Sequence, residues 1–117
     1  MITYYYREGT TETITITLYD GASPANISGY SSVSLFLRSG DGSAQSEAVN
    51  SNGGITITTA ASGIIALNPS LLTTPLLYSK EVYYGYVIVV DGTSKRSSFP
   101  SNEEFAIKML ERYSGDE

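Results

Sequence analysis

Apolar residues recur at every second position in two segments of the amino-terminal half. Residues 13–19 place isoleucine and leucine on one side of an extended chain and threonine on the other. Successive side chains of a strand point to opposite faces, so a period of two with β-branched residues is typical of a half-buried strand. Residues 33–38 repeat the alternation. The two predicted strands have the inward side chains Ile14, Ile16, Leu18, Val33, Leu35 and Leu37.

A pair of short strands and a compact corner are predicted in the middle of the chain. The runs 55–58 and 64–67 are rich in β-branched residues and are separated by the turn-forming Gly63, which is the pattern of a hairpin. Proline is tolerated at the first position of a helical turn, and Asn68 can cap such a turn at Pro69. We expect the leucines that follow to close one end of the fold.

The strongest strand signal lies nearer the carboxyl end. Residues 82–90 are apolar at both odd and even positions. This pattern predicts a central strand that is covered on both faces. Asp91-Gly92 follows directly, and this pair predicts a type I′ hairpin turn, which needs a positive φ at both central residues. Pro100 has no N–H to donate, so it interrupts the returning strand before the alternation resumes at 105–109.

These elements together predict an all-β domain. About seven to eight strands spaced by turns are typical of an immunoglobulin-like antiparallel β-sandwich. The chain has 117 residues, which fits one domain with a core of its own. We predict one sandwich domain over residues 1–112 and a short tail over 113–117 that is flexible or docked on a partner.

Composition narrows the chemistry that this domain can perform. Cysteine and histidine are absent, so disulfides, thiolate metal sites and the commonest general base are excluded. The net charge is −5 and the basic residues are scattered, whereas nucleic-acid binding depends on clustered cations. No segment has the pattern of a signal peptide or a bilayer span. We therefore expect a soluble, non-enzymatic protein with no cofactor, small-molecule substrate, nucleic-acid partner or membrane partner.

The candidate sites for chemistry have a simpler interpretation as turns. Ser79-Lys80 could pair a nucleophile with a base, but neighbours on a strand point to opposite faces. Asp20, Asp41 and Asp91 each adjoin a glycine, where aspartate has a structural role in turns. Asp41 could also offer oxygens to calcium, yet the spaced acidic residues of a calcium loop are missing. Turn formation is the favoured interpretation in each case.

Tyrosine is unusually frequent, with ten residues, and tryptophan is absent. Clusters occur at 4–6 and at 83–86. Tyrosine combines an apolar ring with a polar tip, so it suits both half-buried strands and wet interfaces. Sandwich packing, protein–protein contact and carbohydrate stacking, in that order of preference, are the explanations that the sequence leaves open.

A series of motifs extends over nearly the whole chain. In order they are the Thr/Ile strand, Asp20-Gly21, Pro24-Ala25-Asn26-Ile27-Ser28-Gly29-Tyr30 before Val33, Gly63-Ile64, the leucine and threonine corner, Tyr84-Gly85-Tyr86, Asp91-Gly92 and Ser98-Phe99-Pro100. This order resembles the immunoglobulin-like domain of tailed-bacteriophage baseplate proteins, the type at the amino terminus of the baseplate upper protein. The resemblance implies a virion structural module without catalytic residues. Its partners would be copies of itself and other virion proteins of the baseplate, tail, neck or head.

The chain ends at Glu117, before the receptor-binding parts that usually follow in that family, so we do not expect host recognition from it. Contact surfaces are expected at edges and termini, where a small domain covers its apolar groups least. The candidate interface residues are Tyr4, Tyr5, Tyr6, Leu71, Leu72, Leu76, Leu77, Met109, Leu110 and Tyr113. The expected location is the virion, after synthesis in the host cytoplasm. The alternative function is a carbohydrate-binding or adhesin-type sandwich, and carbohydrate stacking requires a coplanar row of exposed rings.

Overall fold

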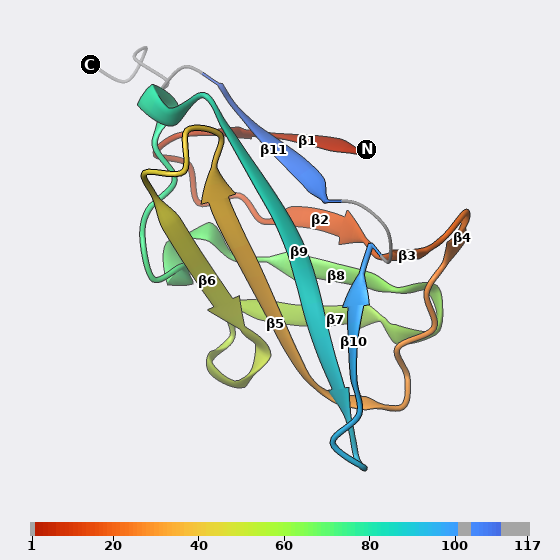
Figure 1. Ribbon diagram of the computed structural model, residues 1–117. Coiled ribbons are helices and arrows are strands. Elements are labelled where there is room, and N and C mark those ends of the chain that lie inside the picture. Colours follow the sequence, from red (N-terminus) through yellow and green to blue (C-terminus); the bar gives the residue numbers. More distant parts are fainter. Residues whose placement is uncertain (1, 101–103, 111–117) are drawn as a thin grey trace.

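The computed structural model of the chain describes residues 2–100 and 104–110, and strands make up most of it (Figure 1). The strands are β1 (Thr3–Arg7), β2 (Ile14–Thr17), β3 (Tyr19–Asp20), β4 (Ser23–Pro24), β5 (Tyr30–Ser39), β6 (Gln45–Val49), β7 (Ile55–Thr59), β8 (Ile64–Leu67), β9 (Val82–Asp91), β10 (Arg96–Phe99) and β11 (Phe105–Leu110). Single turns of 3-10 helix connect some of them, namely η1 (Asn50–Asn52), η2 (Ala60–Ser62), η3 (Pro69–Leu71) and η4 (Tyr78–Lys80).

The strands form two main sheets. The larger sheet has the order β1-β11-β9-β5-β6, and β10 shares one edge of β9 with β11 because β5 occupies the other edge. The smaller sheet has the order β2-β8-β7, and β3 and β4 form a separate small hairpin. All pairs are antiparallel except β1 with β11, which run parallel from Thr3 beside Ala106 to Arg7 beside Leu110.

This strand order is that of an immunoglobulin-like sandwich. β6, β5, β9 and β11 correspond to strands C′, C, F and G, while β2, β8 and β7 correspond to B, E and D. The prediction of an all-β sandwich is confirmed. There are more strands than expected because β3 and β4 are two-residue strands and because β10 and β11 divide one edge of β9. In the described residues, no helix has the length and apolar character needed to cross a membrane.

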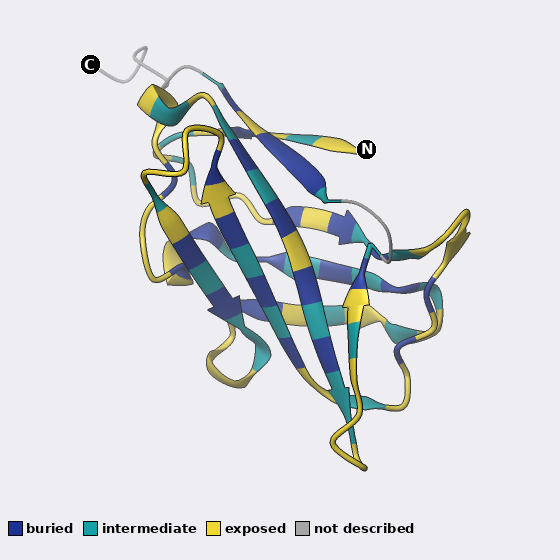
Figure 2. Cartoon of the chain, in the orientation of Figure 1, coloured by how far each residue is buried: buried dark blue, intermediate teal, exposed yellow. Residues whose placement is uncertain are grey.

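One hydrophobic core lies between the sheets (Figure 2). Inward and outward residues alternate along β2 and β5, as the period-two patterns predicted, and they also alternate along β8. All six side chains predicted to point inward from the first two strands are buried. The largest side chains with almost no exposure are Tyr83, Phe105, Ile16, Leu18, Ile27, Leu35, Ile55, Ile65, Leu67, Ile107, Val33 and Val87.

The central strand β9 is covered on one face only, which corrects the expectation of cover on both. Tyr83 and Val87 are buried against the smaller sheet, whereas Tyr84 on the opposite face is half-buried and Tyr86 is exposed. No layer packs on that outer face within the described residues. Tyrosine suits such a face because its ring packs against neighbours while its hydroxyl stays in water. In β9, apolar residues at both odd and even positions therefore do not mean that both faces of the strand are buried.

The hairpin between β9 and β10 forms where predicted, but its turn is not type I′. Positive φ occurs at Ser94 (68°) and not at Gly92. The Asp91 carboxylate accepts hydrogen bonds from the Thr93 N–H, the Thr93 hydroxyl and the Lys95 N–H at 2.8 to 3.0 Å. The Ser94 N–H also donates to the Asp91 carbonyl. These bonds favour a longer loop, in which a turn is followed by one left-handed residue.

The predicted corner closes one end of the sandwich. Pro69 begins η3, and the Asn68 side chain accepts a hydrogen bond from the Ser70 N–H at 3.2 Å, as a helix cap does. Leu72 and Leu76, in the segment that follows, are buried in the core. The expectation that leucines plug this end is confirmed for these two.

The contact between β9 and β5 at Gly85 leaves no room for a side chain. A Cβ there would lie 2.6 Å from both the Phe36 carbonyl oxygen and Leu37 Cδ2. We expect Gly85→Ala to lower the free energy of unfolding by about 1–3 kcal/mol, the usual cost of overpacking. At Gly92 a Cβ would meet no atom within 4 Å. Gly92→Ala should therefore change the free energy of unfolding by less than about 0.5 kcal/mol. Urea denaturation followed by circular dichroism measures both, and equal effects would contradict the packing argument.

Candidate interaction surfaces

The three aspartates that adjoin glycines lie at separate turns. Asp20 belongs to the β3–β4 hairpin and Asp41 to the turn between β5 and β6, while Asp91 ends β9, where the β9–β10 loop begins; Figure 1 shows these elements. Among the described residues, no group of three or more acidic side chains is placed to hold a metal ion. The arrangement brings no pair of these aspartates to a common cleft.

The environment of Asp41 is that of a turn. Its carboxylate accepts hydrogen bonds from the Ser39 hydroxyl, the Ser43 N–H and the Ser43 hydroxyl at 2.6 to 2.9 Å. These bonds hold the pKa of Asp41 well below its usual range, with Lys80 as a minor contributor at 4.0 Å. Lys80 itself lies in η4 and not on a strand, and its Nζ donates to the Ser43 hydroxyl at 2.7 Å. Lys80 thus serves to join two turns.

An open groove of about 400 Å³ lies at the end of the sandwich, beyond β1. One wall comes from β1 and the loop after it. The Tyr6 hydroxyl donates to the Thr10 carbonyl at 2.6 Å, which fixes this loop beside the ring. Glu8 Oε1 accepts a hydrogen bond from the Tyr78 N–H at 2.8 Å and ties the loop to the opposite wall.

The opposite wall is the segment after η3, and the central strand holds it in place. Tyr83 on β9 is only 1% exposed, and its hydroxyl accepts a hydrogen bond from the Leu77 N–H at 3.1 Å. Leu72 and Leu76 point into the core, whereas Leu71 and Leu77 are each 41% exposed. The wall therefore has a buried apolar base, and of the two exposed leucines only Leu77 lines the groove.

The structure brings part of the predicted interface together at this groove and corrects the expected role of four residues. Tyr6, Leu72, Leu76 and Leu77 line the groove, although the first belongs to β1 and the others lie more than sixty positions further along. Tyr6, Leu72, Leu76 and Met109 are at most 8% exposed. Because the domain's own core covers them, these four are core residues and not surface anchors.

Of the remaining predicted residues, three are at least partly accessible and one lies outside the described residues. Tyr5 is 61% exposed and points away from the core. Tyr4 is half-buried, its hydroxyl accepts a hydrogen bond from the Thr17 N–H at 3.1 Å, and burial raises its pKa. Leu110 is half-buried, and Tyr113 lies outside the described residues.

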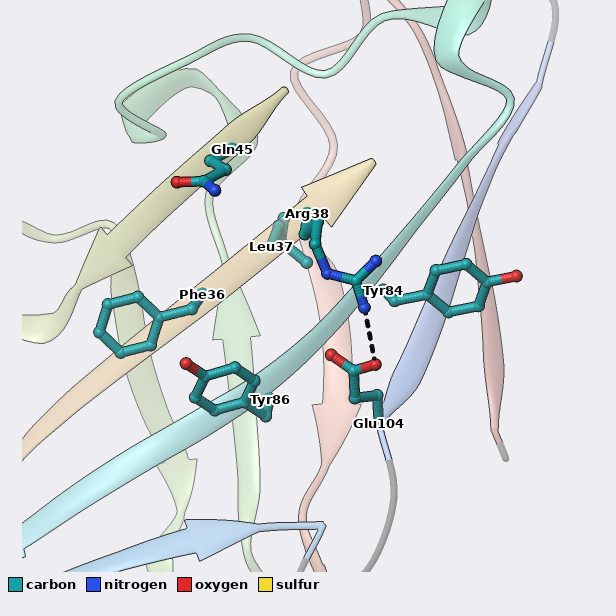
Figure 3. A pocket seen from close by; sticks show the side chains of 7 residues that line it. All are labelled: Phe36, Leu37, Arg38, Gln45, Tyr84, Tyr86 and Glu104. Atoms are coloured by element: carbon teal, nitrogen blue, oxygen red, sulfur yellow. Dashed lines mark hydrogen bonds and ion pairs between the residues drawn. The ribbon is translucent and has the colours of Figure 1, made fainter. Parts of the chain in front are cut away.

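A second surface is the outer face of the larger sheet (Figure 3). Phe36 on β5 and Tyr86 on β9 stack with 5.5 Å between ring centroids and 28° between ring planes. The Arg38 guanidinium carbon lies 5.9 Å from the centroid of the Tyr84 ring, within the range of a cation–π contact. Arg38 Nη2 also pairs with Glu104 Oε1 at 3.0 Å. The side chains on this face thus partly satisfy one another.

Sequence reasoning did not select Phe36 and Arg38 for this face. Part of the signal was present, because they occupy the positions that alternate with the buried Leu35 and Leu37. The partner of Arg38, Glu104, is 66 positions away in the chain, and no local pattern connects the two.

Comparison with known proteins gives no match: no protein-family model, no curated protein and no solved structure matches this chain. A proposal for its function therefore depends on the residues and geometry described above.

The hydrogen bonds to Asp41 predict a pH-dependent stability. Because the folded-state pKa lies below the ordinary value of 3.8, the stabilisation is complete above that value and is lost as the pH falls through the folded-state pKa. Asp41→Ala should melt below the wild type at pH 7, and the difference should shrink below about pH 4. Asp41→Asn keeps an acceptor oxygen, so it should lose less stability at pH 7. Melting temperatures between about pH 2 and 7 test this, and a constant difference would contradict it.

Proposed function

We propose that the chain is a non-enzymatic structural module of a tailed-bacteriophage particle and that it acts through protein–protein contacts. The motif order over nearly the whole sequence supports this, since it resembles the immunoglobulin-like domain of baseplate proteins. The observed strand order is compatible with that resemblance. Under this proposal the partners are neighbouring virion proteins of the baseplate, tail, neck or head, together with copies of the chain itself.

The observation that carries the proposal is the apolar groove at the end of the sandwich. It is open, it has leucines and a tyrosine at its base, and the exposed Leu77 stands at its side. Interface anchors are typically apolar or aromatic side chains that fill such a depression and exclude water. Its one carboxylate, Glu8, already accepts a hydrogen bond from a backbone N–H. This chemistry favours a protein side chain as the occupant over a substrate that needs acid–base groups.

The carbohydrate alternative has less support from the geometry. A sugar platform needs rings that lie coplanar with their faces open to solvent. Phe36 and Tyr86 instead turn one face towards each other, and the Tyr84 ring faces Arg38. Tyr5 is well exposed but lies on a different strand, β1. A glycan array without a hit is the result that we expect.

The first test concerns the particle. Phage particles that carry the gene are purified by density-gradient centrifugation, and quantitative mass spectrometry measures the amount of this chain relative to the major head protein. We expect a fixed ratio across independent preparations. A chain that is absent from the particles, or present in a variable trace amount, would overturn the proposal.

The second test concerns the groove. We expect Leu77→Ser to reduce incorporation into particles about tenfold, since burying an exposed leucine contributes roughly 1–2 kcal/mol to binding. Tyr86→Ser is the control, because it removes a comparably exposed ring from the other surface. Circular dichroism confirms that both variants fold. Equal losses in both would contradict a specific role for the groove.

A further inference from the structure

The smaller sheet ends in a strand with an open edge. β7 pairs with β8 on one side. Within residues 2–100 and 104–110, no segment hydrogen-bonds to the opposite side of residues 55–58. Another segment reaches this edge only after the strand ends, where the Ile27 N–H donates a hydrogen bond to the Ala60 carbonyl at 2.9 Å. The unpaired N–H and C=O groups of such an edge are a template for another strand.

The other edge strands of the two main sheets each carry a hydrogen bond to another segment or an arginine. Along β6, the Thr73 N–H donates to the Glu47 carbonyl and the Thr73 hydroxyl accepts from the Glu47 N–H, both at 3.0 Å. On β2, the Thr17 N–H is held by the Tyr4 hydroxyl. β1 and β10 each carry an arginine, and charges on an edge strand oppose edge-to-edge association. β7 has no charged residue and no proline, and in the part of the chain that the structure describes no segment hydrogen-bonds over its first residues.

The three strands of the smaller sheet are also free of charged residues. No charged residue occurs between Glu47 and Lys80, and none occurs in β2, β7 or β8. The chain as a whole carries a net charge of −5, so most approaches of two copies bring like charges together. In a two-fold dimer a residue on the axis faces its own copy, where any charge would be repelled. An uncharged edge strand can meet itself without this cost.

We propose that β7 pairs with β7 of a second copy of this chain, antiparallel about a two-fold axis, so that two three-stranded sheets become one continuous sheet. The register follows from an irregularity in the β7–β8 pairing between Ile57 and Thr59. The regular part of the edge is therefore Ile55, Thr56 and Ile57. Pairing centred on the middle residue places Thr56 opposite Thr56, and threonine pairs across strands are favourable.

A strand of this length gives a weak dimer in solution. In a particle that holds many copies close together, a weak contact becomes effective because the local concentration is high. The inference rests on the proposed function in this respect, since it makes a second copy of the chain one of the partners within the particle.

The test uses charge at the centre of the pairing. Sedimentation velocity from about 10 μM to about 1 mM should detect reversible dimers of the wild type. Thr56→Lys alone and Thr56→Glu alone each place like charges opposite one another and should weaken dimerisation at least about tenfold. An equimolar mixture of the two variants places lysine opposite glutamate and should restore it.

Thr15→Lys is the matched control. Thr15 lies on β2, in the same row of the same outer face as Thr56, and is exposed to solvent. It adds the same charge away from the β7 edge, so it should change the dissociation constant by less than about twofold. A wild type that is monomeric at about 1 mM, a control as disruptive as Thr56→Lys, or a mixture that stays monomeric would each overturn the inference.

A second measurement needs no variant. Amide hydrogen exchange of β7 in the wild type should slow as the protein concentration rises, while exchange at the end groove should not change. Exchange in β7 that is independent of concentration would overturn the pairing. The two proposals fail separately: a monomeric chain that is present in particles overturns only the pairing, and a dimeric chain that is missing from particles overturns only the proposed function.

Discussion

The larger sheet is wider than the sheet that covers it, and much of the structure follows from this mismatch. Six strands face three across the core, so part of the larger inner face needs cover from irregular segments. Ile27, Leu72 and Leu76 supply it from such segments. Backbone drawn against a core must satisfy its polar groups, and the buried Tyr83 hydroxyl does so by accepting from the Leu77 N–H. The end groove is a consequence of this cover, because the segment that seals the core also forms one of its walls.

The two outer faces differ in chemistry because neither is constrained by the core. On the larger sheet, aromatic rings and a charged pair contact one another across β5 and β9, so this face has local order without an added layer. The smaller sheet presents threonine, alanine and isoleucine without any charge. Among the described acidic residues, Glu47 and Asp91 lie on the larger sheet, Asp20 lies on the β3–β4 hairpin, and the others lie in loops. The proposed β7 pairing therefore brings no charged side chain of that strand out of water.

How much the sequence predicts depends on whether the signal is local. The period-two alternation identified the strands and the inward side chains, and Asn68-Pro69 identified the capped turn at the corner. The apolar run of β9 was misleading about its outer face, because periodicity reports that a side can be buried and not that a layer exists to bury it. The Asp91 turn was misjudged because side-chain hydrogen bonds selected a longer loop. The groove brings Tyr6 and Leu77 together from distant parts of the chain. A local sequence pattern does not report contacts between such distant segments.

The parallel pairing of the first and last strands has a mechanical consequence. β1 and β11 run in the same direction, from Thr3 beside Ala106 to Arg7 beside Leu110. A pull on the two ends of the chain therefore draws the strands past one another, along their length, and loads their hydrogen bonds in shear. Bonds loaded in this way must break together, whereas an antiparallel terminal hairpin pulled at its open end gives way one bond at a time. The parallel pairing therefore resists a pull on the two ends better than an antiparallel terminal hairpin would.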